Sequence, residues 1–332
     1  MSKNWASSLL FKKSSESTTV INIGNYYLKG LLVKGNTITD YFLEKNTNLS
    51  ETLKKVWEEK KMSSDKVKLS LKSPACLVRY FPFPKMDKKK LHQALFFEMN
   101  KFIPFSPEEV YFDYSVLKDS GPNQLTILLA VAKKDLVDNI LAVFRQMNVR
   151  ISEITLDSIC LVNLFLANNT ESQSSNNCIL DIGYKFSTMT IINKGVPFLT
   201  RDVKLNTKDI FQIISRIKDI PIDSVNNWLS SLKTSEEFLE LSQDSISNLC
   251  KEMKNSFDYF EVNSGEHINK LYLTGGLSCV KNISRPFNEY LDTDVDILVT
   301  FPKDKSGLGP VFSEEKFASL KNSFAVSFGL IS

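Results

Sequence analysis

The 332-residue chain lacks the features of several classes of protein. It has no apolar run near the ~20 residues that a membrane-spanning helix needs, and no apolar core of a signal peptide. Its five cysteines are widely spaced, so neither a disulfide framework nor a zinc site is expected. The only histidines, His92 and His267, suggest no catalytic dyad. The 41 basic and 38 acidic residues are too balanced for a nucleic-acid-binding protein.

The composition that remains is that of a soluble globular protein. Hydrophobic residues make up 42% of the chain and charged residues 24%, and its length is sufficient for two domains with their own cores. The segment 5–13 carries apolar and basic residues, but it is too short and weakly patterned to predict a membrane-surface helix. We therefore expect any membrane association to depend on a partner.

One pattern occurs twice, as an apolar strand, a glycine turn and a second strand closed by glycine. The first copy spans residues 20–35 and the second spans residues 179–195. A glycine turn lets backbone N–H groups approach a phosphate, and a carboxylate before it can hold a divalent metal through water. A single copy would equally suit an ordinary β-meander. The repetition predicts a duplicated domain that clamps a ligand.

A third segment adds a different turn. Residues 271–278 read as a short apolar strand that runs into Gly275 and Gly276, and residues 279–290 read as a helix. Such a turn lets an adenine or ribose lie flat against the backbone. Alone, it would be an ordinary strand-to-helix junction.

Together the three segments resemble the actin-like ATPase superfamily, and within it the PilM proteins of type IV pilus assembly, which are relatives of FtsA. The most specific match is Phe-Glu-x-x-Lys-Phe-Ile-Pro-Phe at residues 97–105. The resemblance implies an α/β, actin-like (ribonuclease H-like) duplicated two-lobe fold with an inserted small α+β subdomain. It also implies ATP and Mg²⁺ as cofactors. The implied nucleotide-binding residues are Asn22, Gly24, Asn25, Lys29, Asp181, Gly183, Ser187, Thr188, Gly275 and Gly276.

Within this set the resemblance assigns individual roles. Lys29 would reach the phosphates, although a solvated strand lysine is the alternative. Asp181 would hold Mg²⁺ through water, and Ser187 or Thr188 would cap the phosphate end. Asp181 is the strongest candidate, because a carboxylate that ends an apolar run needs a partner or an exposed turn.

The chain departs from the family pattern at the first hairpin. Asn22 stands where the family usually has aspartate, so the charge that would hold the metal is absent. Asp157 lies where the superfamily places a water-activating residue, but we expect it to be the N-cap of the helix at 158–167. We assign no catalytic residue and predict slow ATPase activity or none.

Three units are predicted. The first lobe comprises residues 1–65, 151–176 and about 314–332, and the second lobe comprises 177–313. The inserted subdomain is residues 66–150, with strands at 66–71 and 77–83 and a helix capped by Asp87. The Asn- and Ser-rich segment 168–177 is the predicted linker, where a hinge could act.

The resemblance implies a partner for the insert. In PilM-like proteins the groove between the insert and the first lobe takes the cytoplasmic N-terminal peptide of PilN, a protein of the inner membrane. Phe97, Phe102, Ile103 and Phe105 are candidates to line this groove, although for each one singly we favour a core position.

The leading interpretation is a cytoplasmic scaffold, peripheral to the inner membrane through its PilN-like partner, at a type IV pilus or related secretion system. Pilus motor ATPases and self-association are further candidate contacts. One alternative is a small-molecule kinase of the same superfamily, for which we can assign neither a general base nor acceptor-binding loops. Another is an FtsA-like division or filament protein, whose amphipathic membrane helix after the fold has no counterpart up to Ser332.

Overall fold

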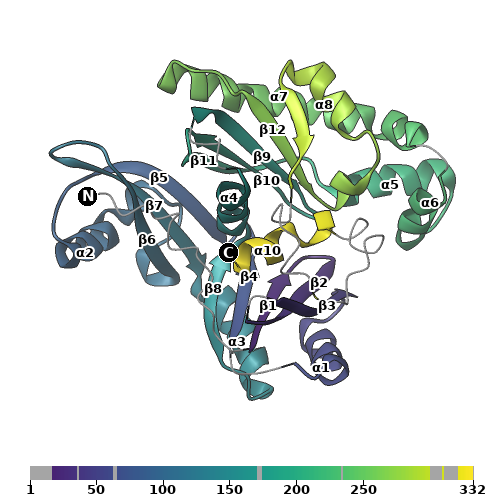
Figure 1. The fold of residues 1–332 in the computed structure, drawn as a ribbon, viewed down its shortest axis with the longest axis horizontal. Coiled ribbons are helices and arrows are strands. Elements are labelled where there is room, and N and C mark those ends of the chain that lie inside the picture. Colours follow the sequence, from purple (N-terminus) through teal and green to yellow (C-terminus); the bar gives the residue numbers. More distant parts are fainter. Residues whose placement is uncertain are drawn as a thin grey trace.

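Two five-stranded sheets and one three-stranded sheet form the frame of the protein (Figure 1). The computed structural model describes residues 17–35, 37–62, 66–169, 174–232, 235–299, 309 and 321–331. Two predicted segments, 5–13 and the part of 314–332 other than 321–331, lie outside these ranges.

The first lobe is built on a mixed sheet of order β3-β2-β1-β4-β8. Its strands are β1 (Ser17–Ile23), β2 (Tyr27–Lys34), β3 (Thr37–Lys45), β4 (Val67–Leu71) and β8 (Ile151–Leu156). The first three pair antiparallel, and β4 runs parallel to β1 and β8. Helix α1 (Leu49–Lys60) begins where the side chain of Asn48 accepts hydrogen bonds from two backbone N–H groups.

The second lobe repeats this sheet, in the order β11-β10-β9-β12-β13. Its strands are β9 (Asn176–Ile182), β10 (Ser187–Asn193), β11 (Val196–Val203), β12 (Lys270–Gly275) and β13 (Asp294–Ile297). The same strand order and directions recur, since β9 to β11 pair antiparallel and β12 pairs parallel with β9 and β13. The predicted duplication is therefore confirmed.

Helices cover the second sheet. They are α5 (Thr207–Lys218), α6 (Val225–Ser231), α7 (Glu236–Ser264) and α8 (Ser284–Leu291). Six apolar side chains of α7 are buried: Leu239, Ile246, Leu249, Met253, Phe257 and Phe260. Within the described ranges no helix combines the length and apolarity needed to cross a membrane.

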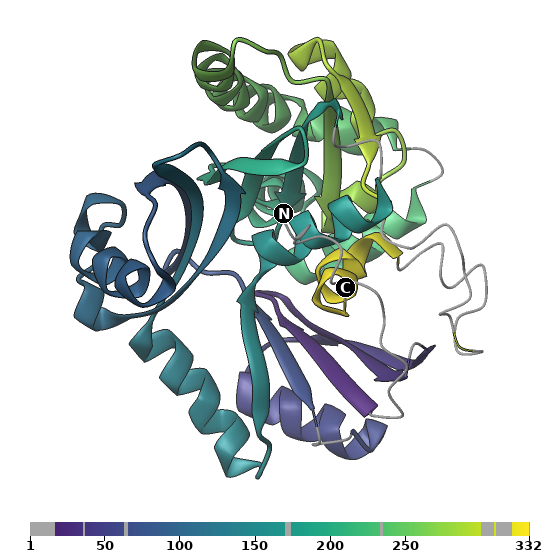
Figure 2. The same cartoon turned by 60° about the vertical axis from the view of Figure 1, so that its left-hand side comes forward.

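Helices α4 (Asp157–Asn168) and α10 (Ala325–Ile331) lie between the two lobes (Figures 1 and 2). Their buried side chains share one cluster with Val20 of β1 and Ile179 of β9, and Phe165 at its centre is fully buried. The helices approach closely at Gly329, where an added Cβ would overlap the carbonyl oxygen of Cys160. This contact joins the end of the chain to the centre of the fold.

The inserted subdomain has its own three-stranded sheet of order β5-β7-β6. Its elements are β5 (Cys76–Pro84), α2 (Lys88–Glu98), β6 (Val110–Asp119) and β7 (Gln124–Lys133). The side chain of Asp87 accepts a hydrogen bond from Lys90 N at 3.1 Å, as predicted for the N-cap. Leu91, Leu95 and Met99 form the buried face of α2 and its short extension.

The predicted boundary of the insert at residue 66 needs correction. Strand β4, expected in the insert, pairs with β1 in the sheet of the first lobe. Helix α3 (Lys134–Gln146), also expected in the insert, packs Val137, Ile140 and Phe144 into the core of that lobe. The separate sheet therefore covers only the chain from β5 to β7.

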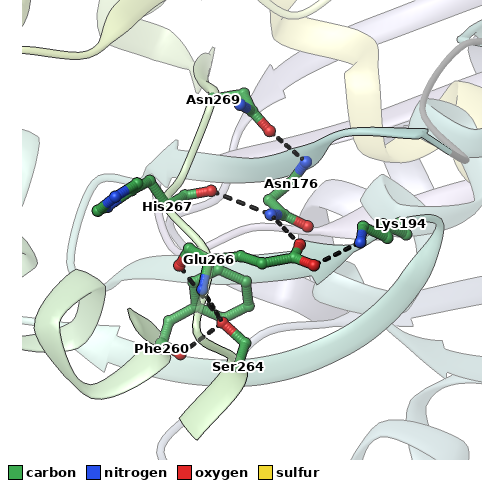
Figure 3. Close-up of polar contacts among 7 residues, drawn as sticks. All are labelled: Asn176, Lys194, Phe260, Ser264, Glu266, His267 and Asn269. Atoms are coloured by element: carbon green, nitrogen blue, oxygen red, sulfur yellow. Dashed lines mark hydrogen bonds and ion pairs between the residues drawn. The ribbon is translucent and has the colours of Figure 1, made fainter. Parts of the chain in front are cut away.

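The predicted linker is shorter than expected, because Asn176 already begins β9. The side-chain N–H₂ of Asn176 donates to Glu266 Oε2 at 2.8 Å and to the carbonyl oxygen of His267 at 3.0 Å (Figure 3). Its backbone N donates to Asn269 Oδ1 at 2.7 Å, and Lys194 forms an ion pair with Glu266. These contacts attach the start of β9 to the loop after α7, so we place no hinge at this end of the linker.

Candidate functional site

The two repeated hairpins meet between the lobes, where the ring centroids of Tyr26 and Tyr184, one from each turn, lie 4.2 Å apart; we call the space between the hairpins the cleft. In the first hairpin, Asn22 lies opposite Lys29 in the register of β1 and β2. In the second, Asp181 lies opposite Thr188 in the register of β9 and β10. The fold thus brings the two predicted phosphate-binding hairpins to one place.

Asn22 is hydrogen-bonded to the carboxylate of Asp157, the first residue of α4. Its Nδ2 donates to both oxygens of Asp157 at 3.0 Å and to Ser70 Oγ at 2.9 Å. Burial, followed by the nearby charge of Asp181, raises the pKa of Asp157 to about 6. The prediction that Asp157 caps α4 is wrong: it is the first residue of the helix, Leu156 holds the N-cap position, and no side chain caps the helix.

Asp181 forms an ion pair with Lys72, which sequence reasoning missed. Lys72 Nζ lies 2.6 Å from Asp181 Oδ2, and the exposed fractions of the two side chains are only 12% and 10%. A signal for Lys72 existed, because it directly follows a strand parallel to β1 and so reaches the same edge of the sheet. Among the described residues no group of three or more His, Cys, Asp or Glu side chains could hold a metal ion.

Lys29 lies in the same polar cluster. Burial lowers its pKa, and the charges of Asp181 and Asp157 act in the opposite direction. The alternative of a solvated strand lysine does not fit this placement. The cleft therefore holds two lysines and two carboxylates in a setting that screens charge poorly.

The four glycines of the three turns serve different purposes. An added Cβ on Gly24 would lie 2.5 Å from Tyr27 O, and one on Gly183 would overlap Phe186 O, so both hairpin turns need glycine for their own geometry. Gly275 has φ +90° and lies against Asp181, where an added Cβ would be 2.8 Å from Oδ1. At Gly276 an added Cβ would meet no atom within 4 Å, so only this glycine opens onto free space. Asn25 lies beside Gly24 in the first turn.

The two hydroxyls predicted to cap a phosphate lie on opposite faces of β10. Thr188 is on the face of Asp181, and its Oγ1 donates to Asp202 Oδ1 at 3.1 Å. Ser187 is fully buried on the other face, and in the described part of the chain its Oγ has no hydrogen-bond partner. Only Thr188 is placed to contribute to the cleft.

The fit of the cleft to a nucleotide with Mg²⁺ is therefore incomplete. Gly276 opens onto free space, and Lys29 lies near Asp181 and Asp157. However, Asn22 is neutral and engaged with Asp157, and the carboxylate of Asp181 is neutralised by Lys72. The cavity that borders Lys72 and Asp157 has a volume of about 190 Å³, and Thr188 is the one predicted nucleotide-binding residue in its lining.

A larger cavity lies between the insert and the first lobe. Its volume is about 890 Å³, and most of its lining comes from β6, β7, α3, β8 and α4, with Tyr80 of β5 and Pro197 of β11 beside them. The lining is mostly apolar, and among the described residues Asp113 and Glu153 are its only charged ones. Within the described chain β6 pairs only with β7 and β8 only with β4, so each strand has an unpaired edge. We refer to this cavity as the insert groove.

None of the four residues predicted for a partner groove lines the insert groove. Phe102 stacks on Phe81 with ring centroids 3.6 Å apart, and Ile103 is buried in the core of the insert. Phe105 packs against the same core, with Lys133 Nζ 4.9 Å from its ring centroid. Phe97 is 77% exposed on α2. The favoured alternative, a core position, therefore describes three of the four.

Comparisons with known proteins agree with this architecture. A family model for the type IV pilus assembly protein PilM matches residues 8–331. A search of curated protein sequences finds no match.

Solved structures share the fold at low sequence identity. A PilM-PilN type IV pilus biogenesis complex matches with a TM-score of 0.84 and 20% identity, covering 96% of this chain and 98% of that chain. The ethanolamine utilization protein EutJ from Carboxydothermus hydrogenoformans matches with a TM-score of 0.53 and 8% identity, covering 95% of this chain and 90% of that chain. MreB 5 of Spiroplasma citri bound to AMPPNP matches with a TM-score of 0.50 and 11% identity, covering 93% of this chain and 95% of that chain. The predicted actin-like fold class is thereby confirmed.

Proposed function

This chain belongs to the PilM family of type IV pilus assembly proteins, and from that premise we propose that it is a scaffold that holds the cytoplasmic N-terminal peptide of a PilN-like membrane protein. The observation that carries this proposal is the insert groove, which is apolar, has a volume of about 890 Å³ and is bordered by two unpaired strand edges. A match to a PilM-PilN complex supports the choice of partner. Docking through this peptide would keep the protein at the cytoplasmic face of the inner membrane.

The groove suits an extended peptide. An unpaired strand edge offers N–H and C=O groups that a peptide can extend as an added strand, and apolar side chains of the peptide can enter the groove. Both charged lining residues are acidic, and Glu153 already pairs with Lys68 at 3.0 Å. We therefore expect the bound peptide to combine apolar residues with at least one basic residue near Asp113.

Filling the groove should abolish peptide binding. Ala130 of β7 lines the groove, and a tryptophan there would occupy the space of the peptide. Ala130→Trp is expected to weaken binding of a labelled N-terminal peptide of the PilN-like partner by about 30-fold or more, which is the size of effect seen when a central interface residue is lost. Fluorescence anisotropy measures the affinity, and a thermal melt establishes that the variant is folded. Phe97→Ala is the matched control, because Phe97 is exposed and lies outside the groove. Weakened binding in the control with unchanged binding in Ala130→Trp would contradict the groove assignment.

The scaffold role does not require ATP turnover, and we predict slow hydrolysis or none. Asp157 is bound to Asn22 and Asp181 to Lys72, so neither carboxylate is free to activate a water. Release of phosphate from ATP in the presence of Mg²⁺ measures this directly. Robust turnover that disappears in Asp181→Ala would show the prediction to be wrong. Nucleotide binding without turnover, contacts with pilus motor ATPases and self-association remain part of the proposal.

A further inference from the structure

We propose that Lys72 is a built-in cation that takes the place of a divalent metal beside Asp181 and links the two lobes directly. Lys72 follows β4 of the first lobe, whereas Asp181 lies in β9 of the second, so their ion pair crosses the cleft.

The first line of evidence is where the ammonium group lies. Lys72 Nζ is 2.6 Å from Asp181 Oδ2 and 3.4 Å from the backbone oxygen of the same residue. An added Cβ on Gly183 would lie only 3.2 Å from it, so the ammonium group lies against the glycine turn of the second hairpin. Both side chains are nearly buried, so water screens their attraction weakly. The positive charge thus occupies the position where the hairpin would otherwise favour a metal ion.

The other oxygen of the Asp181 carboxylate, Oδ1, is also closely packed. Asp181 Oδ1 packs against Gly275, where even an added Cβ would come within 2.8 Å. A bound Mg²⁺ usually keeps several of its waters, which need space around the carboxylate. With Lys72 on one oxygen and Gly275 against the other, that space is already filled.

The opposite hairpin offers no ionised metal ligand of its own. Asn22 is neutral, and its Nδ2 donates to Asp157 and Ser70. The two hairpins therefore supply one carboxylate instead of two, and Lys72 is its ion-pair partner, while the nearby carboxylate of Asp157 accepts hydrogen bonds from Asn22. The chemistry of the donor set thus suits one lysine better than Mg²⁺.

A second contact closes the outer rim of the cleft. The rings of Tyr26 and Tyr184, one from each hairpin turn, have centroids 4.2 Å apart. Tyr26 OH donates to Asp223 Oδ1 at 3.3 Å, and Lys45 Nζ lies 2.8 Å from the same oxygen. The Lys45–Asp223 pair is exposed and contributes little, whereas the Lys72–Asp181 pair is nearly buried.

The test is thermal unfolding of the full chain with and without MgCl₂. We expect Mg²⁺ to leave the Tm of the wild type unchanged. Lys72→Met removes the ion-pair partner of Asp181, so the Tm should fall by about 5 °C or more, and millimolar Mg²⁺ should restore part of the loss. The double variant Lys72→Met/Asp181→Asn should recover most of the Tm without Mg²⁺, because no unpaired charge remains. Lys45→Met is the control and should change the Tm little, with no response to Mg²⁺.

Two results would overturn the proposal. One is a wild-type Tm that rises with Mg²⁺ and loses this response in Asp181→Asn, since Asp181 would then be a metal ligand. The other is a double variant whose Tm loss equals the sum of the two single losses, since the side chains would then be uncoupled. If Lys72→Met does not fold, a double variant that folds still supports the pairing of Lys72 with Asp181. If neither variant folds and Mg²⁺ raises the Tm of the wild type, the proposal is wrong.

Discussion

Gly329→Ala is expected to destabilise the protein by about 3 kcal/mol or more, the upper range for overpacking a core. Gly329 lies in α10, where alanine would by helix propensity alone be favoured by ~1 kcal/mol. Packing reverses this preference, because the new Cβ would overlap the carbonyl oxygen of Cys160 in α4. A backbone oxygen cannot rotate away as a flexible side chain can, so the two helices must separate within the cluster that joins both lobes. Urea unfolding measures the change in the free energy of unfolding.

The matched control for this prediction is Gly276→Ala. An added Cβ there meets no atom within 4 Å, so the free energy of unfolding should change by less than about 1 kcal/mol. A Gly329→Ala variant as stable as the wild type would mean that α4 and α10 do not pack as closely as the structure shows.

Asp157→Asn is expected to stabilise the protein near pH 7.5 by about 2–3 kcal/mol and to flatten its pH dependence. Burial raises the pKa of Asp157 from 3.8 to about 6 in the folded protein, so between these values the folded state binds more protons than the unfolded state. Stability therefore falls as the pH rises from ~4 to ~6, by roughly 3 kcal/mol at 1.36 kcal/mol per pKa unit. An asparagine carries no charge to desolvate, and its oxygen can still accept the hydrogen bond from Asn22.

This prediction is checked by urea unfolding of wild type and variant at intervals between pH 4 and pH 8. The two stabilities should converge near pH 4 and separate as the pH rises to 6. Asp181→Asn provides the contrast, because its carboxylate is ion-paired and its loss should destabilise the protein at pH 7.5. If the stabilities of wild type and Asp157→Asn change in parallel with pH, ionisation of Asp157 does not destabilise the protein, and the prediction is wrong.

The local elements of this protein followed from the order of its residues. The repeated glycine hairpins predicted two equivalent sheets, and both sheets have the same strand order. Asp87 predicted where α2 begins. Each of these features depends on residues a few positions apart, whose periodicity or capping chemistry is visible in the sequence.

The content of the cleft and the position of the insert groove were decided by tertiary structure alone. Lys72 and Asp181 are 109 positions apart, and Asn22 and Asp157 are 135 positions apart, so no local pattern linked either pair. The same holds for β4, whose apolar sequence did not indicate which of two sheets it would join. The sequence by itself determined which segments become strands and helices, because side-chain periodicity acts locally. Only the packing of distant strands determined which charges meet, because the energy of a buried charge depends on the partner that the fold places beside it.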